Sequence, residues 1–264
     1  SPESWNSAPE LIYRQDKCIR CAKCLKICPQ TALKEKKQQI VIDRNKCQAC
    51  GICAQECCSN ALELIGKKTT VQELMTEIMA DKNFYEQSRG GLTISGGEPM
   101  QQYDFTEKLL CAAKKNGLHT CLETSGYAAP EKFLKIIPLV DIFLFDFKEK
   151  NSRLHLRYTG KSNKLIQENL RLLDSIGAQI ILRCPLIPGK NSNQQHYKNI
   201  TCLCKSLKNL GRCDLLPFHN CADSMYRLLG KKNLMAEVSA LSREKTEKIS
   251  AAIKDPVFDQ VFIN

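Results

Sequence analysis

The sequence predicts an α/β protein in which a parallel sheet, with helices outside it, forms a barrel or an open half-barrel preceded by a small cysteine-rich module. Two observations predict this architecture. From about residue 90 the chain repeats the pattern strand, loop, helix, which is typical of a parallel sheet. Before that point, eight cysteines fall into two short runs. A chain of 264 residues is long enough for one large domain and one small one.

The cysteine runs begin at Cys18 and Cys47, and each has the spacing C-x2-C-x2-C-x3-C. This spacing is used for paired [4Fe–4S] clusters, in which the fourth cysteine of each run crosses to the other cluster. We therefore predict one cluster on Cys18, Cys21, Cys24 and Cys57, and a second on Cys47, Cys50, Cys53 and Cys28. The tripeptides Thr-Ala-Leu at 31–33 and Asn-Ala-Leu at 60–62 share the offset of 29, which indicates an internal repeat with pseudo-two-fold symmetry.

Zinc knuckles and a disulfide framework are the alternatives for these cysteines. Zinc sites use two C-x2-C pairs with a longer spacer between them, not four crowded thiols. Disulfides need an oxidising compartment, and no secretion signal is visible. Cys58 stands after the second run where Pro29 stands after the first, so we interpret Cys58 as a substitute for proline and not as a ligand.

Composition limits the function classes. The net charge is +11, but the lysines are scattered and form no arginine-rich patch, so we expect no nucleic-acid partner. No apolar run approaches the roughly 18 residues that span a bilayer, so we expect no membrane association. Sixteen cysteines without a secretion signal indicate reduced thiols and a cytoplasmic location. Exposed low-potential clusters suggest an anaerobic organism, and we expect a monomer.

Three segments follow in order: a polar connector over residues 1–15, the iron–sulfur module over 16–66 and the α/β domain over 67–264. We expect a short strand at 39–42, and a Thr70-x-x-Glu73 capping box that starts a helix reaching Tyr85. The strands expected in the α/β domain are 91–95, 118–123, 141–147, 179–185, 213–217 and 257–263. The helices expected there are 105–116, 130–137, 164–176, 193–209 and 242–254.

Polar residues gather where these strands end, and sites on such folds lie at the carboxyl ends of strands. The first is the loop Ser95-Gly96-Gly97-Glu98-Pro99, whose glycines let a ligand approach the backbone, although ordinary turns are also rich in glycine. The others are Glu123 with Thr124, Asp146 with Lys148, Arg183 and His219. Each has a structural alternative, namely a helix cap for Thr124, an ion pair for Asp146 and Lys148, a core partner for Arg183 and a structural histidine for His219.

The remaining cysteines and histidines are expected to be structural. Cysteines in strand and helix patterns are usually small buried hydrophobic residues. This group comprises Cys111, Cys121, Cys184, Cys202, Cys204, Cys213 and Cys221. We place the other three histidines in the same class, His119, His155 and His196.

Further motifs accompany the glycine-rich loop. They are Asn83-Phe84-Tyr85, Gly90-Gly91, residues 93–99, residues 119–126, Asp146-Phe147-Lys148, and residues 156–160, 183–189 and 215–219. Taken together and in this order, they make the chain resemble the glycyl-radical enzyme activating enzymes that carry a double-cluster ferredoxin domain, a family of radical S-adenosylmethionine (SAM) enzymes. The resemblance covers essentially the whole chain. It implies a partial (β/α)6 radical SAM barrel, without the first strand and the C-x3-C-x2-C loop, and with a small ferredoxin-like insert.

The resemblance also implies the residues that bind SAM. Gly96, Gly97 and Glu98 match the loop that grips the SAM amino group. Glu123 and Thr124 match a pair beside the methionyl group that could help to bind a monovalent cation.

The later strand ends carry the other implied contacts with SAM. The resemblance places Asp146, Phe147 and Lys148 among the SAM-binding residues, and Asp146 and Lys148 could hydrogen-bond the SAM ribose and carboxylate. Arg183 matches a carboxylate clamp, a role that suits its forked guanidinium group. His219 matches a histidine that contacts SAM in the family.

The activity that the resemblance implies is activation of a partner glycyl-radical enzyme. The native protein would cleave SAM reductively, and the resulting radical would abstract a hydrogen atom from a backbone glycine of the partner. The ferredoxin clusters would relay electrons from a flavodoxin or a similar reductant. Two rival functions stay open: an electron-transfer protein with a non-catalytic barrel, and a radical SAM enzyme with another substrate.

One feature of the family is absent from this sequence. Radical SAM enzymes carry a C-x3-C-x2-C run, and here Thr31 and Asn60 stand where its third cysteine would follow the existing pairs. We therefore expect that the chain is truncated at its N-terminus and that it does not cleave SAM alone. A third [4Fe–4S] cluster, chelated by SAM, is expected only in the full-length protein.

Overall fold

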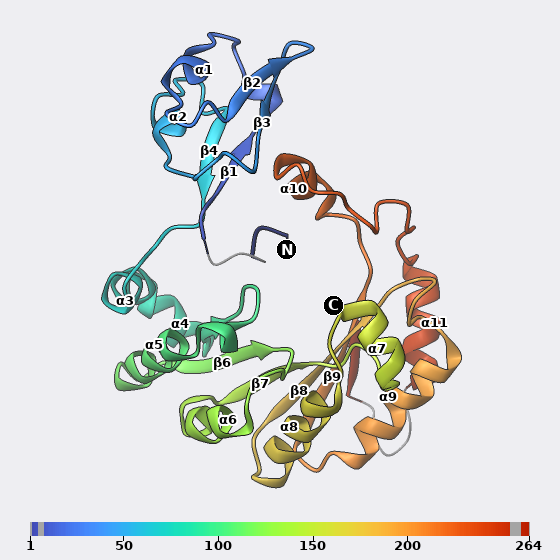
Figure 1. Cartoon of the computed structure of the whole chain (residues 1–264). Helices are drawn as coiled ribbons and strands as arrows, with labels where there is room; N and C mark the ends of the chain where they lie inside the picture. The colour runs from blue at the N-terminus through green and yellow to red at the C-terminus, as the bar shows by residue number, and fades with distance from the viewer. Residues whose placement is uncertain (1, 5–7, 254–259, 264) are drawn as a thin grey trace. The chain divides into compact units, whose positions relative to one another are not determined.

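The computed structural model describes residues 2–4, 8–253 and 260–263. The chain divides into two compact units, the first with residues 1–68 and 221–237 and the second with residues 69–220 and 238–264 (Figure 1). Segment 221–237, which we expected in the α/β domain, therefore belongs to the unit that carries the cysteine runs. Within the described ranges, every helix is too short or too polar to span a lipid bilayer.

The first unit is built from two antiparallel strand pairs. The pairs are β1 (Glu10–Tyr13) with β4 (Leu62–Ile65), and β2 (Leu33–Lys36) with β3 (Gln39–Ile42). The short helices α1 (Lys23–Ile27) and α2 (Ile52–Gln55) each contain the third cysteine of a run. The remaining elements of this unit are η1 (Pro2–Ser4), η2 (Gln15–Lys17) and α10 (Asp223–Leu228).

Left-handed backbone recurs at matching positions in the two halves of this unit. Arg20, Ala22 and Thr31 have φ values of 59°, 56° and 47°, and the residues 29 positions later, Ala49, Gly51 and Asn60, have 51°, 81° and 53°. Such a conformation costs a residue other than glycine about 1 kcal/mol, so it persists only where the surrounding structure demands it. The recurrence confirms the internal repeat and shows that it extends to the backbone of the cysteine loops.

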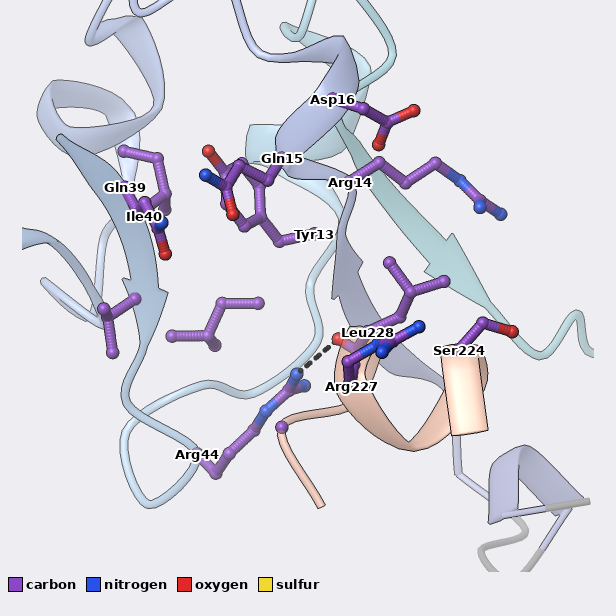
Figure 2. Close-up of a pocket in the computed structure, with 13 residues that line it drawn as sticks. Tyr13, Arg14, Gln15, Asp16, Gln39, Ile40, Arg44, Ser224, Arg227 and Leu228 are labelled. Atoms are coloured by element: carbon purple, nitrogen blue, oxygen red, sulfur yellow. Dashed lines mark hydrogen bonds between the residues drawn. The ribbon is translucent and has the colours of Figure 1, made fainter. Parts of the chain in front are cut away.

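Polar contacts attach segment 221–237 to the strand pairs. Arg44 donates through Nη2 to the carbonyl oxygen of Leu228 in α10 at 3.4 Å (Figure 2). The ammonium group of Lys231 lies 2.9 Å from Oε2 of Glu10 and donates to the carbonyl oxygen of Pro2 at 3.2 Å. These contacts are polar and produce no hydrophobic pattern in the sequence. We therefore expected segment 221–237 in the α/β domain.

The second unit contains a six-stranded sheet with the order β10-β9-β8-β7-β6-β5, in which every neighbouring pair is parallel. Its strands are β5 (Gly91–Ile94), β6 (His119–Thr124), β7 (Ile142–Asp146), β8 (Ile180–Leu186), β9 (Leu210–Pro217) and β10 (Val261–Ile263). The helices are α3 (Val71–Ala80), α4 (Lys82–Ser88), α5 (Tyr103–Lys115), α6 (Pro130–Ile136), α7 (Ser152–Thr159), α8 (Lys164–Ser175), α9 (Gln194–Ser206) and α11 (Arg243–Ile253), with short turns η3 (Pro99–Gln102) and η4 (Ile137–Leu139). The predicted parallel α/β sheet is confirmed.

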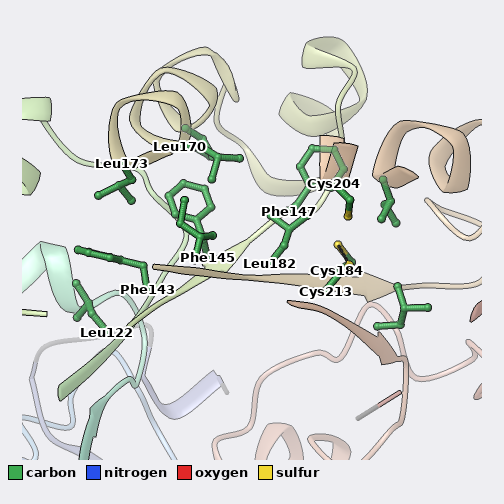
Figure 3. Packing of buried hydrophobic residues seen from close by; sticks show 14 of the residues in the cluster. Leu122, Phe143, Phe145, Phe147, Leu170, Leu173, Leu182, Cys184, Cys204 and Cys213 are labelled. Atoms are coloured by element: carbon green, nitrogen blue, oxygen red, sulfur yellow. Dashed lines mark hydrogen bonds between the residues drawn. The ribbon is translucent and has the colours of Figure 1, made fainter. Parts of the chain in front are cut away.

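The two faces of this sheet differ in character because side chains alternate along each strand. One face is covered by helices: Phe143 and Phe145 of β7 and Leu182 of β8 are buried against Leu170 and Leu173 of α8 (Figure 3). The residues between them in β7 and β8 are only half-buried, and they include Asp146 and Arg183. The core therefore lies on the helix side, and the opposite face is left for polar chemistry.

Some elements differ from the expectations. The helix expected from the capping box at Thr70 through Tyr85 is two helices, because Asp81 ends α3 and the amides of Phe84 and Tyr85 bond its carbonyl oxygen. The capping box itself is formed. Residues 10–13, expected in a connector, form β1 because β4 pairs with them. The first part of the strand expected at 257–263 lies outside the described residues.

The seven cysteines outside the two runs and Cys58 differ in exposure, and Cys111 and Cys121 are partly buried. Cys184, Cys204 and Cys213 are buried in the core, with the Sγ atoms of Cys184 and Cys213 3.7 Å apart, as expected for small hydrophobic residues. Cys202 and Cys221 are exposed, so the expectation of burial is wrong for these two. Cys202 lies on the solvent side of α9, and Cys221 precedes α10.

Two glycines with the same backbone conformation provide a test of the core. Gly126 and Gly160 both have φ of +75°, but a Cβ atom at Gly126 would overlap the ring of Phe145, whereas nothing lies within 4 Å of one at Gly160. Because the backbone cost is shared, we expect Gly126→Ala to lower the free energy of unfolding by roughly 1–3 kcal/mol more than Gly160→Ala. Urea denaturation followed by circular dichroism measures both. Equal losses would contradict the packing of Phe145 against Gly126.

Candidate functional site

The carboxyl ends of β5, β6, β7 and β8 bring the predicted site residues to one edge of the sheet. Asp146 lies beside Arg183 in the register of β7 with β8, and Glu123 lies beside Leu144, on the same face. Ser95 follows β5 and donates to Oε2 of Glu123 at 2.8 Å. Parallel strands place their ends together, which is why residues up to 88 positions apart in sequence meet here.

Glu98 ties the glycine-rich loop to the end of β6. Its Oε1 accepts from the amide of Met100 at 3.2 Å and from the hydroxyl of Thr124 at 2.8 Å, and its Oε2 accepts from the amide of Ser125 at 2.8 Å and from its hydroxyl. A carboxylate offers about four acceptor positions, so the protein itself uses all of them. The loop backbone is open by contrast, because Gly96 has φ of +125° and nothing lies within 4 Å of a Cβ atom built there.

Glu123 and Arg183 form an ion pair across β6 and β8. Nη1 of Arg183 lies 2.7 Å from Oε1 of Glu123, and both side chains are about one-quarter exposed, at 25% and 29%. Nε of Arg183 is buried and has no hydrogen-bond partner among the described residues. A buried donor without a partner is costly, so this nitrogen suits an acceptor supplied by a ligand, such as a carboxylate.

Asp146 and Lys148 lie on one face at the end of β7, as their alternation predicts. Nζ of Lys148 is 3.1 Å from Oδ2 of Asp146. Burial raises the pKa of Asp146, although Lys148 acts in the opposite direction. Phe147, between them, points into the core and stacks on His196, with ring centroids 5.7 Å apart. Of the three residues in this motif, Phe147 is thus a core residue.

A cavity of about 400 Å³ lies at this edge of the sheet, and Glu98, Asp146 and Lys148 line it together. Tyr127 and Lys161, which the sequence analysis missed, line it too, and Nζ of Lys161 lies 5.5 Å from the centre of the Tyr127 ring. Tyr127 directly follows the motif at residues 119–126, so its position next to that motif could have identified it. The only feature of the sequence that could have identified Lys161 is its position directly after Gly160.

Asp214 is a third residue that the sequence analysis missed. It lies beside Arg183 in the register of β8 with β9, is buried, and receives a hydrogen bond from Nη2 of Arg212 at 3.1 Å. Its alternation with Arg212 along β9 was the available signal. His219, the last predicted residue, is exposed two residues after β9. His196 is buried as expected of a structural histidine, and burial lowers its pKa although Glu149 is 3.9 Å away.

The cysteines of the first unit line two separate cavities. One is lined by Cys18, Cys21, Cys24 and Cys57, and the other by Cys28, Cys47, Cys50 and Cys53. Each set takes three thiols from one run and one from the other, which is the crossed arrangement that the spacing predicts. Among the described residues, no three His, Cys, Asp or Glu side chains converge closely enough to hold a single metal ion.

The surroundings of the crossing thiols fit a negatively charged cluster. The amide of Ala32 donates to Sγ of Cys28 at 3.3 Å. Burial acts to raise the pKa of Cys57, but backbone hydrogen bonds from Leu62 and Ala61 and a side-chain bond from Ser59 outweigh it and lower the pKa. Because thiolates are the ligands of iron–sulfur clusters, donors aimed at these sulfur atoms favour the ligating form.

Comparisons with known proteins agree with this geometry. Residues 45–198 match the model of the radical SAM superfamily, and residues 10–58 match that of the 4Fe-4S dicluster domain. Among solved structures, the fold is similar to a domain of pyruvate-formate lyase-activating enzyme from Bacteroides vulgatus, with a TM-score of 0.56, 23% identity, and coverage of 66% of this chain and 99% of that one. It is also similar to Streptococcus suis SuiB bound to S-adenosylmethionine, with a TM-score of 0.56, 14% identity, and coverage of 76% and 43%.

Curated relatives define the family more narrowly. The trans-4-hydroxy-L-proline dehydratase activating enzyme of Clostridioides difficile is 37% identical over 94% of this chain and 83% of its own length. The isethionate sulfite-lyase activating enzyme of Nitratidesulfovibrio vulgaris is 35% identical over 96% and 84%. The pyruvate formate-lyase 2-activating enzyme of Escherichia coli is 34% identical over 92% and 74%. The chain therefore belongs to the radical SAM superfamily and, within it, to the glycyl-radical enzyme activating enzymes.

The crossed thiol sets can be tested with paired substitutions. Cys28 and Cys50 line the same cavity although they belong to different runs, whereas Cys28 and Cys24 belong to one run but line different cavities. We expect Cys28→Ala/Cys50→Ala to lose about half of the iron and Cys28→Ala/Cys24→Ala to lose nearly all of it. Iron and sulfide analysis of the anaerobically reconstituted protein measures both, with Cys58→Ala as a control that loses none. The reverse order would show that the cysteines do not cross.

Proposed function

We propose that this protein activates a glycyl-radical enzyme by removing a hydrogen atom from a backbone glycine of that partner. The observation that carries the proposal is the match to activating enzymes at 34–37% identity over more than nine-tenths of the chain. SAM, bound at a reduced iron–sulfur cluster, supplies the radical that takes the hydrogen atom. The residues of this chain bind SAM, orient it and deliver electrons.

The residues at the strand ends supply the SAM site in this proposal. The loop backbone at Gly96 and Gly97, which is open at Gly96, accepts the amino group, and Glu98 holds that loop against β6. The unpartnered Nε of Arg183 receives the carboxylate. Asp146 and Lys148 face the ribose from the cavity that they line together with Tyr127.

Two further assignments belong to this proposal. Glu123 and Thr124 are offered as ligands of a monovalent cation, supported by the position of both at the end of β6. Two [4Fe–4S] clusters in the thiol-lined cavities relay electrons from a flavodoxin or a similar donor. We place the protein in the cytoplasm, supported by sixteen cysteines in a sequence that shows no secretion signal.

The activity is tested with the protein expressed from its natural gene. Anaerobic incubation with SAM, a reductant and a glycyl-radical enzyme encoded in the same genome should yield 5′-deoxyadenosine and a glycyl radical visible by electron paramagnetic resonance. Deoxyadenosine without a radical on any encoded glycyl-radical enzyme would indicate another substrate. Neither product, with the clusters fully loaded, would favour an electron-transfer protein instead.

The relay predicts a dependence on the electron donor. We expect Cys50→Ala to abolish activation when flavodoxin is the donor, because Cys50 lines one of the two cluster cavities. Activation should survive when a small reductant can reach the SAM site directly. Cys58→Ala, next to the ligand Cys57, is the matched control and should behave like wild type with both donors. Undiminished activation of Cys50→Ala by flavodoxin would contradict the relay.

Replacing an aspartate by asparagine should have opposite effects on stability at Asp146, which ends β7, and at Asp141, which immediately precedes it. Burial raises the pKa of Asp146 from 3.8, so its charged form opposes folding as pH rises above that value, and Asp146→Asn should leave stability near pH 7 unchanged or higher. Burial also acts to raise the pKa of Asp141, but hydrogen bonds from Lys114 and Thr120 outweigh it and lower the pKa. Asp141→Asn should therefore cost about 1–3 kcal/mol at neutral pH, and the loss should fade as pH falls through the lowered pKa.

SAM affinity should change in the reverse order. Asp146→Asn removes a charged partner of the SAM ribose and should weaken binding about 10- to 100-fold, whereas Asp141→Asn should leave it unchanged. Calorimetric titration of SAM into the anaerobic protein, alongside urea denaturation at several pH values, measures both effects. If both variants lost stability and affinity together, Asp146 would be a structural residue.

A further inference from the structure

The two halves of the iron–sulfur module share a backbone but differ in charge. Residues 10–37 carry eight Lys and Arg residues, whereas residues 39–66, their equivalents in the repeat, carry only two. The repeat relates Arg20 to Ala49, Lys23 to Ile52 and Lys26 to Gln55. The two halves therefore share the positions of the thiols and the left-handed turns, but they differ in the number of basic residues.

The basic residues surround the first cluster cavity, which is lined by Cys18, Cys21, Cys24 and Cys57. Arg20 and Lys23 line this cavity themselves, and Lys17 and Lys26 are exposed beside them in the chain. Ile19, on the same loop, is 64% exposed. Lys23 is paired with Glu56, which also lines the cavity, so the excess positive charge around Ile19 comes from Lys17, Arg20 and Lys26. An exposed apolar residue among charges that are mainly positive suits a small, transient interface whose partner is steered by opposite charge.

A larger cavity adjoins this loop (Figure 2). It has a volume of about 880 Å³ and shares Tyr13 and Ile40 with the first cluster cavity. Three guanidinium groups line it, those of Arg14, Arg44 and Arg227. Arg44 is exposed, donates to the carbonyl oxygens of Leu11 and Leu228, and forms no ion pair within the described residues. Its unmatched charge favours a carboxylate brought by a partner.

We propose that this basic face, made of Lys17, Arg20, Lys23 and Lys26 around Ile19 together with the arginine-lined cavity, docks an acidic electron-carrier protein. Electrons then enter the module on the side of Cys18, Cys21, Cys24 and Cys57. One electron leaves the donor and one is gained by the module, and no atom or proton is transferred. The inference rests on the proposed electron relay and adds its entry point and the chemistry of its partner.

Two double variants with the same change in net charge test the docking face. Arg20→Ala/Lys26→Gln gives the first loop the residues of the second and removes two positive charges. Gln48→Glu/Gln55→Glu adds two negative charges around the second loop, where both glutamines are exposed. The probe is an acidic flavodoxin, with its binding measured by titration and its electron transfer by stopped-flow bleaching of the clusters at low and high salt.

We expect flavodoxin to reduce the clusters of Arg20→Ala/Lys26→Gln about tenfold more slowly than wild type at low salt, and this rate should lose most of its salt dependence. The rate for Gln48→Glu/Gln55→Glu should stay within about twofold of wild type. The viologen radical cation, which needs no basic surface, should reduce all three proteins alike and so report intact clusters. Equal losses in the two variants, or no loss in either, would overturn the docking face. Absence of any complex between wild type and flavodoxin would overturn the acidic partner. If flavodoxin docked as expected but activation did not depend on the two clusters, the result would support the docking face and refute only the electron relay.

Discussion

The alternation of side chains along parallel strands is the constraint on which the larger unit depends. In β7 and β8 every second residue is buried against helices, and this packing fixes the strands in register. The residues between them must then face the other side, so Asp146 and Arg183 meet there without any contact of their own to bring them together. The polar edge is therefore a consequence of the apolar core. It is also why a single strand, β7, presents phenylalanines to the core and an aspartate to the cavity.

The polar edge is built at a cost to stability. Asp146 has its pKa raised by burial, and Nε of Arg183 is buried with no partner among the described residues, so each opposes folding. Asp141, which immediately precedes β7, is a structural acid, because Lys114 and Thr120 donate hydrogen bonds to its carboxylate. The two acids therefore differ: the charge of Asp146 opposes folding, whereas the charge of Asp141 is held by hydrogen bonds of the fold.

Much of the fold could be predicted from the sequence, because its strongest signals are local. The alternation of strands and helices predicted the parallel sheet, and the capping box at Thr70 formed as expected. The two sets of cysteines that the spacing predicts line two separate cavities. The failures concern long-range partners. Residues 10–13 become a strand only because β4 pairs with them. Segment 221–237 is held by contacts of Lys231 and Arg44, and such polar contacts produce no periodic pattern in the sequence. Lys161 was missed for the same reason, since its role depends on Tyr127 across the cavity.

The repeat in the iron–sulfur module has an evolutionary consequence. Each half contributes one strand to each pair, since β1 and β2 come from the first half and β3 and β4 from the second, and β1 pairs with β4 while β2 pairs with β3. The thiols are exchanged in the same way. Neither half can complete a strand pair or a cluster site alone. A single ancestral half would have needed a second copy of itself, and after gene duplication and fusion neither copy could be deleted. The strand pairing and the thiol positions do not constrain the surface residues, so the two halves can differ in charge as they do here.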